Sequence, residues 1–501
     1  MLNNNSKKTS HILNNGKKGH LPVAGILFAA IASLCAAPQM AQAACKTLYV
    51  APNGLDTNPG TIDKPLLSIH QAGKKLLPCD TLKLLSGTYK QFGVWMVNSG
   101  TATAPITITA AEGAKPVLDG TGLGIPRYYP FITLVGNYIN LSGMEFMNGN
   151  DGIWVKGNNN KVSSMKVHHL MNRGILITGD FNTVENSEVS HAALENVNGL
   201  RTDWACGIGS YLSYNTSATV KGMVLRNNTI HDVWGEGLQT FQSDGTIVEG
   251  NTSYDNWARN FYITASYNLI FRNNLAYNTP NNYVKKRSEG LTLAEEAPLN
   301  RNSEKLVIIN NMFHNADINA YSWTINPGTG LKNALIANNT IINGRLMTGP
   351  LNQAAIIKNN TIFRNDGGEV SYIKSAFITG KYTSPLQIGQ TEKINFSNNL
   401  WSVAPASAEA KGANDVISAD PKFVMAIKPY LTLTQGAITK NDFAIDPSLS
   451  PALSKGATIY SVTDSYLVTS EQGKTTNTGA YPANPPFSYL AVQASVTQTA
   501  P

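Results

Sequence analysis

Three charged residues stand at equivalent places in consecutive short repeats of the sequence. Glu236, Arg259 and Glu289 each come directly before a short apolar segment that predicts a β-strand. If these strands are parallel neighbours, the two carboxylates lie about 10 Å apart with the guanidinium between them. Such carboxylates could act as acid and base in glycoside hydrolysis, and the arginine could offset a uronate carboxylate during β-elimination. The alternative is a charge ladder in which Arg259 only neutralises its neighbours.

The position before each strand can be followed along the chain as a column. Its members are Asp151, Arg173, Cys206, Glu236, Arg259, Glu289, Asn319 and Arg345. Elimination needs a cation for the substrate carboxylate and a base for the C5 proton. The side chains available for these roles are Arg173, Arg259, Lys285, Lys286 and Arg287.

A second column follows the apolar residue of another strand in each repeat. It contains His168, Ser190, His231, Tyr254, Tyr277 and His314. We interpret it as a structural stack inside the fold. His231 is the candidate catalytic exception, because it shares a repeat with Glu236.

Polar and aromatic side chains near the first column predict a sugar-binding groove. We expect substrate contacts from Trp154, Tyr211, Gln239, Phe241, Tyr262, Lys285 and Lys286. The aromatic members could instead form a stack that only stabilises the sheet. Asp203, Glu295 and Glu296 could bind Ca²⁺ through carboxylate oxygens, or could lie in solvated loops. We assign no other cofactor, since HExxH, CxxC, P-loop and GxSxG motifs are absent.

The elements that would position these residues are repeats of one short pattern. Asn228, Asn251 and Asn274 are spaced by 23 residues, and each marks a turn between short strands. This period is too short for a propeller blade and too rich in strands for a helical repeat. It fits one coil of a solenoid whose stacked coils bury a common core. Asparagine suits the turns because it tolerates left-handed backbone and can hydrogen-bond along the stack.

The strands that follow the column can be phased by alternation. Period two places Ile153, Ile175, Ile208, Leu238, Phe261, Leu291 and Tyr321 inside. The alternate residues then face out, and they are Trp154, Leu176, Gln239, Tyr262 and Thr292. The predicted fold is all-β, a right-handed parallel β-helix with a short N-terminal capping helix. We expect that helix at residues 68–77, with Ile69, Ala72, Leu76 and Leu77 on its buried face.

The N-terminus predicts export. Lysines precede an apolar run and an Ala41-Gln42-Ala43 cleavage site, so we assign residues 1–43 to a signal peptide. Residues 44–90 form the predicted cap and first coil, 91–400 the β-helix, and 401–501 the closing segment and flexible tail. The net charge of +7 falls to about +3 without the four leader lysines, and no basic run with interleaved aromatics indicates nucleic-acid binding. We expect a monomer with no membrane attachment after cleavage.

Three cysteines remain after the predicted cleavage. Cys45 opens the first strand and Cys79 precedes the next, so a disulfide between them is the preferred pairing in an exported protein. Cys206 is then interpreted as a small buried residue.

Several segments identify a resemblance. YVAPNG, DTNPGT, CDTLKLLSGTY and PITITAAEGAKPVLDG resemble the first coils of secreted β-helix proteins of the pectate-lyase-like superfamily. DFAIDPSLSPALSKG and TGAY resemble their closing segments, so the likeness covers roughly residues 46–481. It implies the fold more specifically than the activity, because this fold carries lyases, epimerases, hydrolases and binding proteins.

The favoured hypothesis is a secreted lyase that cleaves an acidic polysaccharide by β-elimination. The alternatives are a glycoside hydrolase using Glu236 and Glu289, and a non-enzymatic glycan-binding surface or matrix protein.

Overall fold

The computed structural model describes most of the chain after residue 43. The described residues are 44–201, 204–212, 218–294, 303–320, 332–348, 355–367, 372–374, 394–405, 408–452 and 455. From Cys45 onward they belong to one compact unit, and the predicted signal peptide lies outside them. No helix among the described residues is long and apolar enough to cross a bilayer.

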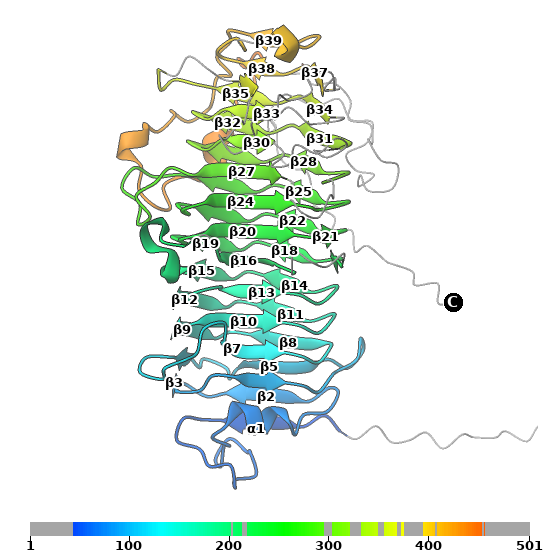
Figure 1. The fold of residues 1–501 in the computed structure, drawn as a ribbon, viewed down its shortest axis with the longest axis vertical. Coiled ribbons are helices and arrows are strands. Elements are labelled where there is room, and N and C mark those ends of the chain that lie inside the picture. Colours follow the sequence, from blue (N-terminus) through cyan, green and yellow to red (C-terminus); the bar gives the residue numbers. More distant parts are fainter. Residues whose placement is uncertain are drawn as a thin grey trace, which may run out of the picture. The chain divides into compact units, whose positions relative to one another are not determined.

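Three parallel sheets make up the β-helix, and the chain visits them in the order A, B, C in each coil (Figure 1). Within the described residues, sheet A contains β1 (Thr47–Val50), β2 (Thr81–Leu84), β5 (Ile106–Ala110), β8 (Ile139–Ser142), β11 (Lys161–Ser163), β14 (Thr183–Glu185), β18 (Val224–Arg226), β22 (Ile247–Glu249), β25 (Ile270–Arg272), β28 (Val307–Ile309), β31 (Ala334–Ala337), β34 (Ala355–Lys358) and β37 (Ile394–Ser397). Sheet B contains β3 (Gly87–Tyr89), β6 (Pro116–Asp119), β9 (Glu145–Gly149), β12 (Lys166–Leu170), β15 (Glu188–Ser190), β19 (Thr229–His231), β23 (Thr252–Tyr254), β26 (Leu275–Tyr277), β29 (Met312–His314), β32 (Thr340–Ile342), β35 (Thr361–Phe363), β38 (Leu400–Trp401) and β39 (Val416–Ile417). Sheet C contains β4 (Val94–Met96), β7 (Pro130–Leu134), β10 (Asp151–Val155), β13 (Ile175–Ile177), β16 (Cys206–Ser210), β20 (Glu236–Phe241), β24 (Arg259–Thr264), β27 (Glu289–Ala294), β30 (Ile318–Ala320), β33 (Leu346–Thr348) and β36 (Tyr372–Lys374). A short side pair joins β17 (Val220–Lys221) to β21 (Ser243–Asp244). The predicted right-handed parallel β-helix is confirmed.

The core fills the space enclosed by the three sheets. The predicted inward residues of sheet C from Ile153 to Leu291 are at most 1% exposed, and they stack in register from β10 to β27. One coil alone could not bury these side chains, so each coil depends on its neighbours for its apolar contacts.

The turn from sheet A to sheet B carries an asparagine ladder. Asn228 donates from Nδ2 to Oδ1 of Asn251 at 3.0 Å, and Asn251 donates in the same way to Asn274 at 3.0 Å. The ladder continues through Asn311, Asn339, Asn360 and Asn399. The left-handed backbone belongs to the residue before each ladder asparagine, such as Asn227 and Asn273. The turn therefore divides the two predicted roles between adjacent positions.

A short helix and a disulfide close the N-terminal end. Helix α1 (Ile69–Gly73) starts after Ser68, whose side chain accepts a hydrogen bond from the Gln71 amide, and it buries Ile69 and Ala72. The helix is shorter than predicted, and Leu77 lies outside it at 58% exposure, so its assignment to the buried face was wrong.

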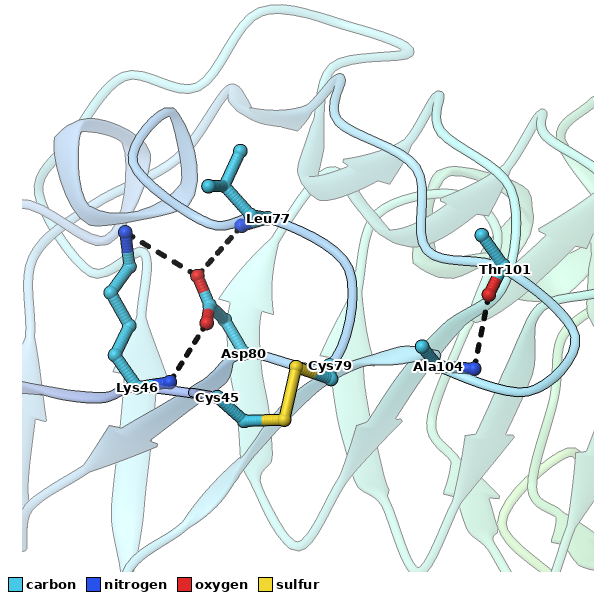
Figure 2. Close-up of a disulfide and its surroundings, with 7 residues drawn as sticks. All are labelled: Cys45, Lys46, Leu77, Cys79, Asp80, Thr101 and Ala104. Carbon is cyan, nitrogen blue, oxygen red and sulfur yellow. Dashed lines mark hydrogen bonds and ion pairs between the residues drawn. A yellow bond between two sulfur atoms is a disulfide. The ribbon is translucent and has the colours of Figure 1, made fainter. Parts of the chain in front are cut away.

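The predicted disulfide joins Cys45 to Cys79 (Figure 2). Beside it, Asp80 accepts hydrogen bonds from the backbone amides of Lys46 and Leu77. The disulfide and this carboxylate together fasten the first strand to the start of β2.

A C-terminal segment packs on the outer face of sheet B. It includes the short helices η3 (Tyr430–Thr432) and η4 (Lys440–Phe443), while η1 (Leu194–Gly199) and η2 (Ala408–Ala410) lie in earlier connections. Leu433, Ile438 and Phe443 cover the outward side chains of Tyr254 and Tyr277 in an apolar cluster separate from the main core. Outward residues of sheet B are therefore buried without entering the β-helix.

Candidate functional site

The predicted column forms along the start of the sheet C strands. Backbone pairing aligns Cys206 with Glu236, Glu236 with Arg259, and Arg259 with Glu289. Arg173 lies beside Asp151 and Cys206 in the same column. The structure therefore brings Glu236, Arg259 and Glu289 together as the sequence predicted.

The column ends differently from the prediction after Glu289. Ile318 takes the inward position opposite Leu291, so Asn319 pairs with Thr292 and not with Glu289. Arg345 lies beside Asp317, to which its Nη2 forms an ion pair at 2.7 Å. The predicted inward Tyr321 lies outside the described residues. The sequence was phased incorrectly here because Ile318 and Tyr321 offered competing inward positions.

Arg259 and Glu289 form a half-buried ion pair. Arg259 Nε lies 2.8 Å from Glu289 Oε2, in a geometry outside hydrogen-bond alignment, and the two side chains are 15% and 23% exposed. Arg259 also donates from Nη1 to the Ala258 carbonyl. Glu289 accepts from the Thr292 hydroxyl and, at 3.0 Å, from Asn319 Nδ2. These contacts fix the carboxylate and orient the guanidinium at the surface of the column.

Lys286 adds an amine to this pair. Its Nζ lies 4.1 Å from the ring centre of Trp257, which follows β23 in the turn before β24. Lys286 is exposed to solvent, but partial desolvation lowers the pKa of its amine, the positive charge of Arg259 lowers that pKa further, and Glu289 opposes both effects. A lysine with a lowered pKa is more often neutral at a given pH and is a better candidate for a general base.

Three other members of the column are closed to solvent. Asp151, Cys206 and Glu236 are 4%, 1% and 5% exposed. Burial raises the pKa of the Cys206 thiol to about 12, so this cysteine stays protonated. It is the small buried residue predicted from the sequence. Burial also raises the pKa of Asp151.

The predicted sugar-binding residues divide into two groups. Gln239, Phe241 and Tyr262 are 7%, 1% and 5% exposed, so the prediction that they present open surfaces to a sugar was wrong for this structure. Alternation correctly put Tyr262 and Gln239 on the outer side of sheet C, but that side is covered at these coils. Trp154 and Tyr211 are partly exposed, and Lys285 is exposed with a left-handed backbone.

Arg173 lies among aromatic rings further towards the N-terminus. Its guanidinium is 5.5 Å from the ring centre of Tyr128 and 5.4 Å from that of Tyr211. Arg127 lies 4.4 Å from the Tyr128 ring and pairs with Glu195 at 2.8 Å. Arg127 and Tyr128 were missed by sequence reasoning because turn residues carry no strand alternation. The arginine beside a tyrosine in Arg127-Tyr128-Tyr129 was the one signal that could have suggested them.

His231 belongs to the second column, which lies outside the β-helix. Pairing aligns His168, Ser190, His231, Tyr254, Tyr277 and His314 as predicted. Their side chains are on the outer face of sheet B, so the interpretation of a stack inside the fold was wrong. His231 Nδ1 lies 2.7 Å from Asp232 Oδ2, and its ring stacks on Tyr254. These contacts join His231 to the face covered by the C-terminal segment, and the structure does not bring it to Glu236.

The three candidate metal ligands cannot be placed. Asp203, Glu295 and Glu296 lie outside the described residues. Among the residues that are described, no group of three histidine, cysteine or acidic side chains is arranged to hold a metal ion. We derive no catalytic step through calcium.

Comparison with known proteins decides the family. Residues 48–316, just over half of the chain, match the family described as Pel9A-like, right handed beta helix region. The chain belongs to this family. The crystal structure of pectate lyase Pel9A aligns with a TM-score of 0.52 and 16% identity, covering 88% of this chain and 96% of that one. This Pel9A-like similarity supports the fold.

Curated relatives match shorter regions of the Pel9A-like chain. Pectate lyase PEL9 of Emericella nidulans is 40% identical over 77 residues, which cover 15% of this chain and 19% of that protein. Pectate lyase L of Dickeya dadantii is 31% identical over 153 residues, which cover 28% of this chain and 36% of that protein. The chain thus spans about a third or less of the length of these relatives.

Proposed function

We propose that this protein is a secreted polysaccharide lyase that cleaves a uronate-containing polymer by β-elimination. The observation that carries the proposal is the half-buried Arg259–Glu289 pair with the amine of Lys286 close by over the Trp257 ring. Partial desolvation and the charge of Arg259 lower the pKa of this lysine. Membership of a family whose curated relatives include pectate lyases supports the reaction class.

The three side chains have distinct roles in the proposed reaction. Arg259 binds the uronate carboxylate and stabilises the negative charge that develops on it. Neutral Lys286 takes the C5 proton on Nζ, and the C4–O bond breaks as the C4=C5 double bond forms. The leaving oxygen takes its proton from water. Glu289 holds Arg259 in position and does not touch the reacting atoms.

This assignment predicts the pH dependence of the reaction. Lys286 acts only when it is neutral, so kcat/KM rises as pH rises through its pKa in the free enzyme. Because that pKa is lowered, the rise should come below the ordinary lysine range near 10.5. Replacing Glu289 by Gln removes the charge that opposes the lowering and should move the rise to still lower pH. A pH–rate profile of wild type and Glu289→Gln checks the direction, and an unchanged or upward shift would contradict the role of Lys286.

A hydrolase is less well supported by the geometry. Glu236 is 5% exposed, and both oxygens of Glu289 already accept hydrogen bonds from Asn319 and Thr292. Hydrolysis would need both carboxyl groups to reach the glycosidic bond and an open position for water.

A substrate panel tests the proposal. The mature protein is incubated with pectate, alginate, glucuronan and neutral glycans, and both new reducing ends and the ultraviolet absorbance of unsaturated uronates are followed. A lyase raises both signals together on an acidic polymer. Reducing ends without absorbance would indicate hydrolysis, and silence on both would leave a glycan-binding protein.

Two parts of the proposal have separate tests. Arms with calcium and with chelator examine whether Asp203, Glu295 and Glu296 contribute a metal site to the reaction. Export is supported by the Cys45–Cys79 disulfide, since structural disulfides form mainly in oxidising compartments. Mass spectrometry of the mature N-terminus would check cleavage after Ala43.

A further inference from the structure

The outer face of sheet C near its N-terminal end presents two tryptophans. Trp95 on β4 and Trp154 on β10 both pair with Thr133 on β7, so they flank one position at a separation of about 10 Å. Trp95 is 39% exposed and Trp154 is partly exposed. Lys156 Nζ lies 3.7 Å from the Trp154 ring centre and 5.4 Å from that of Trp95. One ammonium group therefore lies near both indole rings.

The same coils carry more aromatic and basic groups where the strands begin. Tyr128 and Tyr129 directly precede β7 and are 40% and 45% exposed. Arg127 and Arg173 both lie near the Tyr128 ring, at 4.4 Å and 5.5 Å from its centre. Open rings and cations thus extend across the width of the sheet.

Positive charge exceeds negative charge on this surface. Glu195 is shared by Arg127 at 2.8 Å and Arg201 at 3.9 Å. Asp151 lies beside Arg173, but burial raises the pKa of this carboxyl group. Lys156 adds a further cation over the indoles. An anion that met this surface would gain charge pairing, and a neutral ligand would not.

We propose that these coils form a second binding site for an acidic polysaccharide, which we call the aromatic–basic platform and define as Trp95, Tyr128, Trp154, Lys156 and Arg173. The C–H faces of sugar rings would pack on the exposed aromatic rings, and uronate carboxylates would meet Lys156 and Arg173. The choice of an acidic polymer rests on the proposed function.

The platform is separate from the proposed reaction centre. Arg173 and Arg259 belong to one column but are three strand spacings apart, about 14 Å. A chain held on the platform at Arg173 would continue along the strand starts of sheet C towards Lys286. Binding there raises the local concentration of polymer at the reaction centre without contacting the bond that breaks.

The structural alternative is that Lys156 and Arg173 only stabilise their coils through cation–π contacts. That role predicts a loss of thermal stability and no loss of affinity in platform variants. The binding role predicts the reverse, so melting curves are measured beside affinity for every variant.

The experiment measures equilibrium binding of the mature protein to polygalacturonate and to a neutral galactan. The platform variants are Lys156→Gln, Trp95→Ala and the combined change. We expect the combined variant to bind polygalacturonate at least about tenfold more weakly, with little affinity for galactan in any protein. Lys156→Gln keeps a long polar side chain and should remain folded. It therefore still tests the platform if the tryptophan variants have lowered melting temperatures.

A matched control lies on sheet B. Lys166 on β12 is an exposed lysine that pairs with Glu145 at 3.4 Å. Lys166→Gln should bind polygalacturonate as wild type does. Equal losses in the control and the platform variants, unchanged affinity in the platform variants, or no binding by wild type would each overturn the platform.

Measuring unsaturated product in the same samples distinguishes failure of the platform proposal from failure of the proposed lyase activity. If binding depends on the platform residues but no unsaturated product forms, the platform proposal stands and the lyase proposal is rejected. Unsaturated product with wild-type affinity in the platform variants would retain the lyase and reject the platform.

Discussion

The outer face of sheet C differs between its N-terminal coils and its central coils. On β4 and β10, Trp95 is 39% exposed and Trp154 is partly exposed beside Lys156, while Thr133 between them on β7 is buried. Over β20, β24 and β27, the equivalent outward residues Gln239, Tyr262 and Thr292 are at most 7% exposed. The same alternation of inward and outward residues thus leaves outward aromatic rings partly exposed in the N-terminal coils and buried in the central coils.

This difference shows that an alternating strand pattern predicts which face of the sheet a side chain lies on. It does not predict whether that face is exposed to solvent. In the central coils, chemistry is confined to the strand starts, where Arg259 and Glu289 remain partly exposed. Charged groups held in such a partly closed place interact more strongly than in water. The N-terminal coils offer wide contact area instead, which suits binding more than catalysis.

Removal of the proposed base should have the largest effect. Lys286→Ala should lower kcat by about 10²- to 10⁴-fold, the usual contribution of general-base catalysis. Its melting temperature should change little, because the side chain lies over Trp257 at the surface. Steady-state kinetics on a uronate polymer measure the loss, with Lys161→Ala on sheet A as the control. A fall of less than about threefold would remove Lys286 from the mechanism.

The loss of stability on truncating an aromatic side chain should differ between the buried central coils and the exposed N-terminal coils of sheet C. Tyr262→Ala should reduce the free energy of unfolding by about 3 kcal/mol or more, because it leaves a cavity at a side chain that is 5% exposed. Trp95→Ala should cost about 1 kcal/mol or less, since Trp95 is already 39% exposed. Denaturant titrations compare the two variants. Equal losses would mean that the two faces are buried alike.

The covered face of sheet B provides a pH test of closure. Burial lowers the pKa of His314 to about 4, so the unfolded chain binds this proton more readily than the folded one. Stability from the neutral side chain is present above the unfolded pKa near 6.5 and falls by roughly 3 kcal/mol as pH drops to 4.

His314→Gln should remove this part of the acid sensitivity. Unfolding free energies of wild type and variant are compared at pH 7 and pH 4, so that other titrating groups cancel in the difference. The same loss in both proteins would show that His314 is accessible to protons in the folded state.

Much of the architecture follows from local signals in the sequence. The spacing of Asn228, Asn251 and Asn274 set the coil, and alternation aligned the column from Arg173 to Glu289. The phase failed at Asn319, because a three-residue strand offers too few residues to choose a register. Coverage of Tyr262, and of Tyr254 by the C-terminal segment, depends on contacts distant in sequence. Turn residues such as Arg127 and Tyr128 join these surfaces through the fold alone.

The most direct test of this division of labour is to measure kcat and KM for Lys286→Ala and Trp95→Ala on one uronate polymer, followed by the absorbance of unsaturated product. The structure predicts that Lys286→Ala lowers kcat with little change in KM. Trp95→Ala should raise KM with little change in kcat. Loss of kcat in Trp95→Ala, or wild-type kcat in Lys286→Ala, would contradict the separation of a binding platform from a central reaction site.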